Sequence, residues 1–281
     1  MRKNRFGKVS ERIGVVFLQR KHSNTMRYFL TLSYKGTNYN GWQIQRNAPS
    51  VQGKLEEALA LLLRRPTPVT GAGRTDTGVH ARYYVAHFDT TEAIRDRAGF
   101  CYHLNAVLPY DIAVHELLPV RADAHARFDA TEREYRYLIL TAKDPFARET
   151  AWLYHGALHI DAMNEAAAHL LAFDDFTTFA KLNSANKTNI CDVRHAVWTQ
   201  AGDRLEFTIR ANRFLRNMVR AITGTLVEVG RGKMTPEEFR AIIAARDLSL
   251  SGSSAPAQGL YLSDVRYPAD LFLTDIETDR A

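Results

Sequence analysis

The stretch GAGRTDTGVHARYYVAHF, residues 71–88, joins a glycine-rich polar loop to a strand candidate at 83–88, and the elements around it define the fold class. Before the loop, apolar residues recur at the spacing of one helix face. Ser50 is a suitable N-cap for this helix, and Pro66 must end it. The apolar positions are Val51, Leu55, Ala58, Leu59 and Leu62.

The rest of the chain continues this mixture of strands and helices. Strands are predicted at 26–34, 112–117, 135–140, 193–199, 205–210 and 260–267, the fourth and fifth forming a hairpin around Gly202-Asp203. Helices are predicted at 99–108, 163–171, 213–229 with Gly230 as C-terminal cap, and after Thr235, which begins a capping box. The similar contents of the two halves predict an α+β fold of two ferredoxin-like or RRM-like subdomains, residues 26–125 and 126–281.

Charge is distributed unevenly along the 281 residues, which carry a formal net charge of +6. Residues 1–25 hold seven basic side chains and one acidic one, so the remainder has 30 of each and is formally neutral. A basic protein suggests a nucleic-acid partner, but the net charge alone establishes no partner here. We expect the basic leader to be a disordered arm or a mis-called start that activity does not need.

Composition excludes several classes of protein. The two cysteines, Cys101 and Cys191, form no CxxC pair and cannot build a disulfide framework, which argues against structural zinc and an oxidising compartment. No apolar run approaches the ~20 residues of a membrane span. The pair His155 and His159 lacks further ligands for zinc. These features predict a soluble cytoplasmic protein without a membrane segment.

The polar loop at 71–81 is the candidate site of chemistry. Its glycines allow unusual backbone conformations, and Arg74 and Asp76 are two residues apart, so they point the same way in an extended segment. Asp76 beside a cation would stay ionised and could act as a base or nucleophile. Two alternatives remain open from the residues alone, an ordinary Asx-turn and, more weakly, a phosphate cradle without GK[ST] or GxGxxG.

The motifs along the chain closely resemble the tRNA pseudouridine synthase A (TruA) family. The loop GAGRTDTGVHA resembles the family's catalytic signature, and further blocks follow in family order from about residue 26 to 267. These blocks are YKGTNYNGWQIQ at 34–45, SVQGKLEEAL at 50–59, HFDT at 87–90, LNAVLP at 104–109, DIAV at 111–114, ARFDATEREYRY at 126–137, DDFTTF at 174–179, FLRNMVRAITGTLVEVG at 214–230 and GLYLSDVRY at 259–267.

The resemblance implies an activity and its setting. Family members isomerise uridine to pseudouridine at positions 38, 39 and 40 of the tRNA anticodon stem-loop, as homodimers, without cofactor and without a metal for the chemistry. It also implies that antiparallel sheets of the two subdomains join around a central active-site cleft. Two rivals stay open: a non-catalytic RNA-binding protein on the same scaffold, and an enzyme that modifies other uridines.

The resemblance also assigns roles to individual residues. Asp76 matches the catalytic aspartate, which attacks the ribose C1′ or acts as a base. Arg220 is expected to pair with Asp76, while Arg213, Arg216 and Arg220 at i, i+3 and i+7 would share one helix face, with the first two as candidate phosphate contacts. The candidate substrate contacts are Tyr135 against the uracil, Arg74 on the RNA, Arg220 beside Asp76, and Leu260 at the uracil pocket.

Each of these assignments has a structural alternative. Tyr135 and Leu260 could be core residues, and the arginine stripe could be a solvated face. His80 is expected to support the loop, and Trp42 and Gln43 to support the cleft. Tyr84 departs from the family, in which glutamine is frequent at this position.

Overall fold

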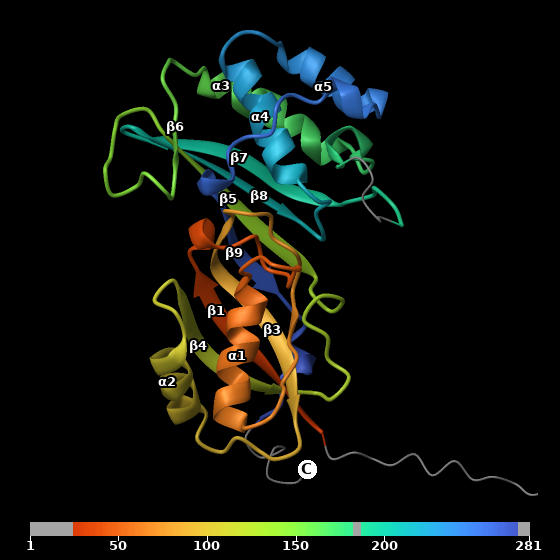
Figure 1. Ribbon diagram of the computed structural model, residues 1–281. Helices are drawn as coiled ribbons and strands as arrows, with labels where there is room; N and C mark the ends of the chain where they lie inside the picture. The colour runs from red at the N-terminus through yellow and green to blue at the C-terminus, as the bar shows by residue number, and fades with distance from the viewer. Residues whose placement is uncertain (1–24, 182–186, 275–281) are drawn as a thin grey trace, which may run out of the picture.

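The computed structural model describes residues 25–181 and 187–274 (Figure 1). The predicted leader, residues 1–25, therefore lies outside the described residues except for Thr25. The fold mixes helices with one large and mostly antiparallel sheet, so the predicted mixed α/β content is correct. Within the described ranges, no helix is long and apolar enough to cross a membrane.

The sheet is continuous across the molecule. Its strand order is β4 (Ile112–Val120), β1 (Met26–Tyr34), β3 (His80–Thr90), β9 (Leu260–Arg266), β5 (Glu132–Leu140), β8 (Arg204–Ala211) and β7 (Val193–Ala201). Two short strands lie off this path: β2 (Thr70–Gly71) pairs with β3 and β6 (Trp152–Leu153) pairs with β5. The two predicted sheets are thus one sheet in the described chain.

Strand β9 makes the connection between the halves. It pairs antiparallel with β5 and parallel with the start of β3, where His80 lies opposite Tyr261 and Ala81 opposite Leu262. This pairing extends β3 three residues upstream of the predicted start at Tyr83. A partner strand from the other end of the chain is a non-local contact, so local sequence patterns do not reveal it.

Helices cover the two parts of the sheet (Figure 1), and the two larger hydrophobic cores lie between these helices and the sheet. The first packs α1 (Val51–Leu63) and α2 (Arg97–Val107) on β1, β3 and β4; the second packs α3 (Ile160–Ala168), α4 (Met218–Gly230) and α5 (Pro236–Ala245) on β5, β8 and β7. Strand β9 serves both cores, because Leu260 is buried in the second and Leu262 and Val265 in the first. The two halves are therefore joined by a shared strand as well as by the chain connection between them.

The predicted helix starts are confirmed where capping signals were read. The Ser50 side chain accepts a hydrogen bond from the Gly53 N–H at 3.1 Å, and α1 ends at Leu63, before Pro66. At α5, the Thr235 hydroxyl accepts from the Glu238 N–H at 3.1 Å while the Glu238 carboxylate accepts from the Thr235 N–H at 2.7 Å. This reciprocal pair is the capping box expected from the sequence.

The helix predicted over 213–229 begins later than expected. Asn217 has a left-handed backbone (φ 65°), and α4 starts only at Met218. The Asn217 amide donates to the Ser254 hydroxyl at 2.7 Å, which holds this turn in place. Arg213 and Arg216 consequently lie before the helix and only Arg220 lies in it, so the predicted single face of three arginines is wrong.

The predicted glycine cap of this helix is also misplaced. Gly230 is the last helical residue, and the left-handed glycine is Gly232 (φ 70°). A Cβ on Gly230 would lie 2.4 Å from the Met163 sulfur. Gly230 is therefore needed for the close approach of α4 to α3, not for the helix terminus.

Candidate active site

The polar loop lies between β2 and β3, where the two halves of the molecule meet (Figure 1). Its first residues join the first core through Ala72, whose N–H donates to the Val85 carbonyl at 2.8 Å. Its last residues join the second core through Val79. The loop between them, which carries Asp76, is thus fixed at both ends by different halves of the fold.

Aromatic side chains beneath the loop fix its conformation. Tyr84 is fully buried, stacks on Trp42 at a ring distance of 4.1 Å, and donates its hydroxyl to the Gly73 carbonyl. Tyr34 and Thr75 share a hydrogen bond between their hydroxyls at 2.9 Å. The residue that departs from the family pattern, Tyr84, therefore contacts the loop directly, and Trp42 supports it, in agreement with the support role expected for Trp42.

His80 supports the loop from its C-terminal side, as expected. Its Nδ1 accepts a hydrogen bond from the Gly36 N–H at 2.9 Å, so its Nε2 carries the proton and donates to the Gln258 carbonyl at 3.1 Å. Burial lowers the pKa of His80 below its ordinary value. The neutral imidazole ties the loop to the segment that leads into β9.

Two arginines flank the carboxylate of Asp76. The distance from Arg220 Nη1 to Asp76 Oδ2 is 3.6 Å, and that from Arg216 Nε to Asp76 Oδ1 is also 3.6 Å. Each carboxylate oxygen thus faces one guanidinium group. The Asp76 side chain keeps 23% of its surface exposed, so a substrate can reach it.

The second arginine differs from the expected one. The sequence predicts Arg220 as the partner of Asp76 and places Arg74 beside it, whereas the structure brings Arg216 to Asp76 together with Arg220. Arg74 is exposed on the loop itself. The late start of α4 explains the difference, because the turn before the helix directs Arg216 toward the loop.

Tyr135 lies close to Asp76 at the middle of β5. Its ring makes an edge contact with Phe214 at a ring distance of 5.2 Å, and it borders both cores. Burial raises the pKa of Tyr135 to about 12; nearby Arg133 opposes this shift, and the Asp76 carboxylate adds to it. Tyr135 is therefore a neutral phenol beside the carboxylate, in contact with the core and with the site at once.

Arg133, two residues before Tyr135, was not predicted from the sequence. Its terminal nitrogens donate to the carbonyls of Asn212 at 3.0 Å, Ala72 at 2.9 Å and Arg127 at 2.7 Å. Burial lowers the pKa of this guanidinium. Because these carbonyls belong to three segments around the site, Arg133 fixes the segments relative to one another.

Leu260 is buried at the start of β9, opposite Tyr137, with 5% of its surface exposed. It shares the second core with Val79, the residue at the end of the loop. Leu260 is thus a core residue that belongs to the same cluster as the end of the loop, and its role at the uracil pocket stays a prediction.

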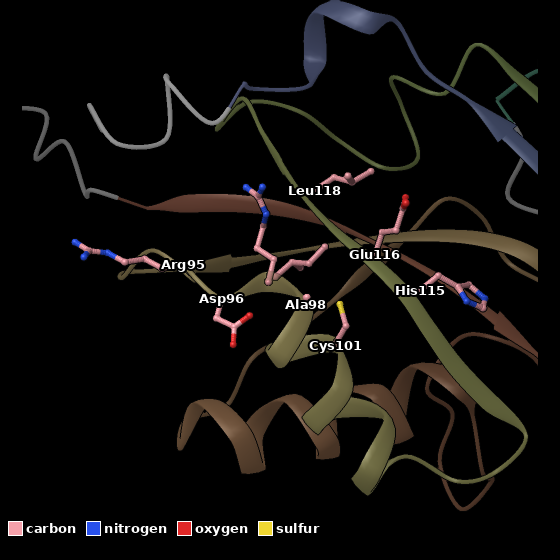
Figure 2. Close-up of a pocket in the computed structure, with 9 residues that line it drawn as sticks. Arg95, Asp96, Ala98, Cys101, His115, Glu116 and Leu118 are labelled. Carbon is pink, nitrogen blue, oxygen red and sulfur yellow. The ribbon is translucent and has the colours of Figure 1, made fainter.

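A hollow of about 440 Å³ lies elsewhere, between α2 and β4 (Figure 2). Cys101 and Asp96 line it from α2 and its N-cap, and His115 and Glu116 line it from β4. No residue of the polar loop contributes to it. Within the described residues, no group of three or more His, Cys, Asp or Glu side chains could hold a metal ion.

Comparison with known proteins agrees with the resemblance found in the sequence. The family model of tRNA pseudouridine synthase matches residues 166–268. The tRNA pseudouridine synthase A of Parabacteroides distasonis is 54% identical over 246 residues, 88% of this chain and 98% of the relative. The proteins of the same name from Bacteroides thetaiotaomicron and Bacteroides fragilis are 53% and 51% identical, over 88% and 89% of this chain and 92% and 99% of theirs.

The matched region includes α4 with Arg220 and the strand β9, so it covers the second half of the site. The longer alignments span nearly the whole of each relative. The chain belongs to the tRNA pseudouridine synthase A family.

Proposed function

We propose that this protein isomerises uridine to pseudouridine in tRNA, with Asp76 as the catalytic residue. The observation that carries the proposal is the placement of Asp76, which is partly exposed and lies between Arg216 and Arg220 with Tyr135 beside it. The family relationship supports the reaction and the substrate. The target uridines are those at positions 38, 39 and 40 of the anticodon stem-loop.

The reaction breaks the bond between uracil N1 and ribose C1′ and forms a bond between C5 and C1′. The proton on C5 leaves and N1 gains one, so the net change is an isomerisation without cofactor. A carboxylate near an anomeric carbon stabilises such a cleavage, as it does in glycoside hydrolysis. Asp76 acts on the ribose either by attack on C1′ or as a base, and a guanidinium group lies 3.6 Å from each of its carboxylate oxygens.

The other side chains position the uridine. The base must leave its stack to reach Asp76, and exposed Arg74 contacts the RNA at the entrance. Tyr135 faces the base with its ring or its neutral hydroxyl, supported by Phe214. Arg220 forms an ion pair with Asp76, and Leu260 packs against the uracil from the apolar core.

The protein is proposed to work as a cytoplasmic homodimer on whole tRNA. Recognition of an RNA stem depends on shape and backbone contacts, because the major groove of A-form RNA is too deep and narrow for side chains. Binding should weaken as salt rises, since phosphate contacts release counterions.

The reaction is tested by tritium release from tRNA labelled at uracil C5. We expect release with the native protein and release at background with Asp76→Asn and Asp76→Ala, while both variants still bind tRNA. Asp247→Asn is a suitable control, since Asp247 caps a 3-10 turn by accepting from the N–H and the hydroxyl of Ser249. Tritium release by Asp76→Ala would disprove the catalytic role of Asp76.

The rivals make different predictions in the same assays. A non-catalytic RNA-binding protein would bind tRNA and release no tritium. An enzyme for other uridines would release tritium but leave pseudouridine at positions 38 to 40 unchanged in cells that lack it. Mapping of pseudouridine in those cells therefore tests the proposed positions independently.

A further inference from the structure

The two arginines beside Asp76 are held in different ways. Arg220 is 21% exposed at the side chain, whereas Arg216 is 57% exposed, although both lie 3.6 Å from a carboxylate oxygen. An identical distance with such different burial indicates that the two guanidinium groups do not serve the same purpose.

Arg220 is anchored to its surroundings. Its Nε donates to the Ala255 carbonyl at 2.7 Å, and the Ala255 N–H donates back to the Arg220 carbonyl at 3.0 Å. Ala255 itself is buried, with 2% of its surface exposed. This reciprocal pair keeps Arg220 in place whether or not a substrate is present.

Arg216 has a fixed backbone and an exposed side chain. The Met218 N–H donates to the Leu215 carbonyl at 3.2 Å across the turn that contains Arg216, and the Asn217 amide donates to Ser254. The Arg216 guanidinium extends from this turn to within 3.6 Å of Asp76 Oδ1. Exposed ion pairs contribute little to stability, so this pair can open at low cost.

We propose that Arg216 is an exchangeable counter-charge, which covers Asp76 Oδ1 in the free protein and moves to an RNA phosphate when the target nucleotide enters. Arg220 continues to hold Oδ2, and Oδ1 becomes free to act on the ribose. Arg216 is thus a positioning residue that couples RNA binding to exposure of the carboxylate. This inference rests on the proposed function of Asp76.

The electrostatics of the site favour such an exchange. A nucleotide that places its ribose against Asp76 brings a phosphate within one nucleotide of the carboxylate, and two anions in a partly buried site repel each other. An arginine at the entrance can pair with the phosphate through its forked donors, which removes this repulsion. A fixed arginine such as Arg220 could not move to it without losing its bond to Ala255.

The test compares Arg216→Gln, Arg216→Lys and Arg220→Gln in tritium release from full-length tRNA across a range of salt concentrations. Arg246→Gln is the matched control for lost charge, because Arg246 is also exposed (64%) and paired, at 3.2 Å from Asp175. For Arg216→Gln we expect a several-fold higher KM and a slope of log KM against log salt that is smaller by about 0.7 to 0.9. The value of kcat should stay within a few-fold of the native one.

The other variants complete the prediction. Arg216→Lys keeps the charge and should restore most of the slope, whereas Arg220→Gln should lower kcat and leave the slope unchanged. The proposal is overturned if Arg216→Gln lowers kcat as Arg220→Gln does, or if its slope equals that of Arg246→Gln. Absence of tritium release by the native protein would instead refute the proposed function itself.

Discussion

Gly41→Ala should impair catalysis although Gly41 bears no functional group. Gly41 has a positive φ of 88°, and a Cβ built on it would lie 2.2 Å from the Thr75 carbonyl oxygen and 3.3 Å from the Asp76 carbonyl carbon. Backbone of this left-handed type costs a residue with a Cβ about 1–2 kcal/mol. The added methyl group therefore strains the backbone and collides with the loop next to Asp76.

The size of the effect follows from the distance. The 2.2 Å contact must open by at least ~1.2 Å to reach an ordinary nonbonded separation of about 3.5 Å. Hydrogen bonds between the Tyr34 and Thr75 hydroxyls and from the Tyr84 hydroxyl to Gly73 restrain the first part of the loop. The displacement is therefore expected at Asp76 and the residues after it. A misplacement of about 1 Å at a reacting group can lower the rate ~10²-fold.

Gly202→Ala separates this effect from loss of stability. Gly202 also has a positive φ (58°), in the β7–β8 turn, but nothing lies within 4 Å of its Cβ position. Gly202→Ala should lose about 1–2 kcal/mol of unfolding free energy from the backbone alone. Gly41→Ala should lose more, because the collision with Thr75 adds to the same backbone cost. In single-turnover tritium release, below the melting temperature of both, only Gly41→Ala should be slow; a folded Gly41→Ala variant with the native rate would refute the reasoning.

Three further outcomes are expected. Arg133→Lys keeps the charge, but the lysine ammonium cannot reach three carbonyls at once. We therefore expect kcat to fall at least about tenfold with a smaller change in KM. An unchanged kcat in the folded variant would rule out this role. Thr235→Ala should lose ~1 kcal/mol in urea unfolding at native activity, because the capping box lies on α5; a loss of activity without a loss of stability would contradict this. Burial raises the pKa of Tyr135 from 10.0 to about 12, so the stabilisation by its neutral phenol is complete below pH 10 and is lost as the pH rises toward 12. The free energy of unfolding should therefore decline between pH 10 and 12, and it should decline less in Tyr135→Phe.

The elements predicted from the sequence were those with local signals. Ser50 and Thr235 begin helices because their side chains accept hydrogen bonds from the first turn, and this requires only neighbouring residues. The start of α4 was missed because Asn217 takes a left-handed conformation stabilised by Ser254, 37 residues away in the chain. Helical spacing continued through 213–217, so the pattern gave no sign of the turn.

The same limit applies to the candidate site. The loop with Asp76 stood out by composition, and Arg220 by the resemblance, and the structure brings the two together. The roles of Arg216 and Arg133 depend on contacts between distant segments, which spacing does not encode. Arg133 lies two residues before Tyr135, outside the strand predicted at 135–140, and the structure begins β5 at Glu132, so that both side chains belong to one strand.

The charge of the site does not come from the net charge of the protein. The described chain follows a leader that holds the whole formal excess of +6, yet the arginines that face Asp76 belong to the formally neutral remainder. Asp76 lies in a loop of the first half, and both arginines lie in the second. The contact between Asp76 and the two arginines depends on β9, which pairs with β3 at His80 and with β5 at Tyr135. The segment just before β9 is hydrogen-bonded to His80 through the Gln258 carbonyl. The continuous sheet therefore determines that positive side chains lie at the Asp76 carboxylate, because it holds the two halves at the distance at which the ion pairs form.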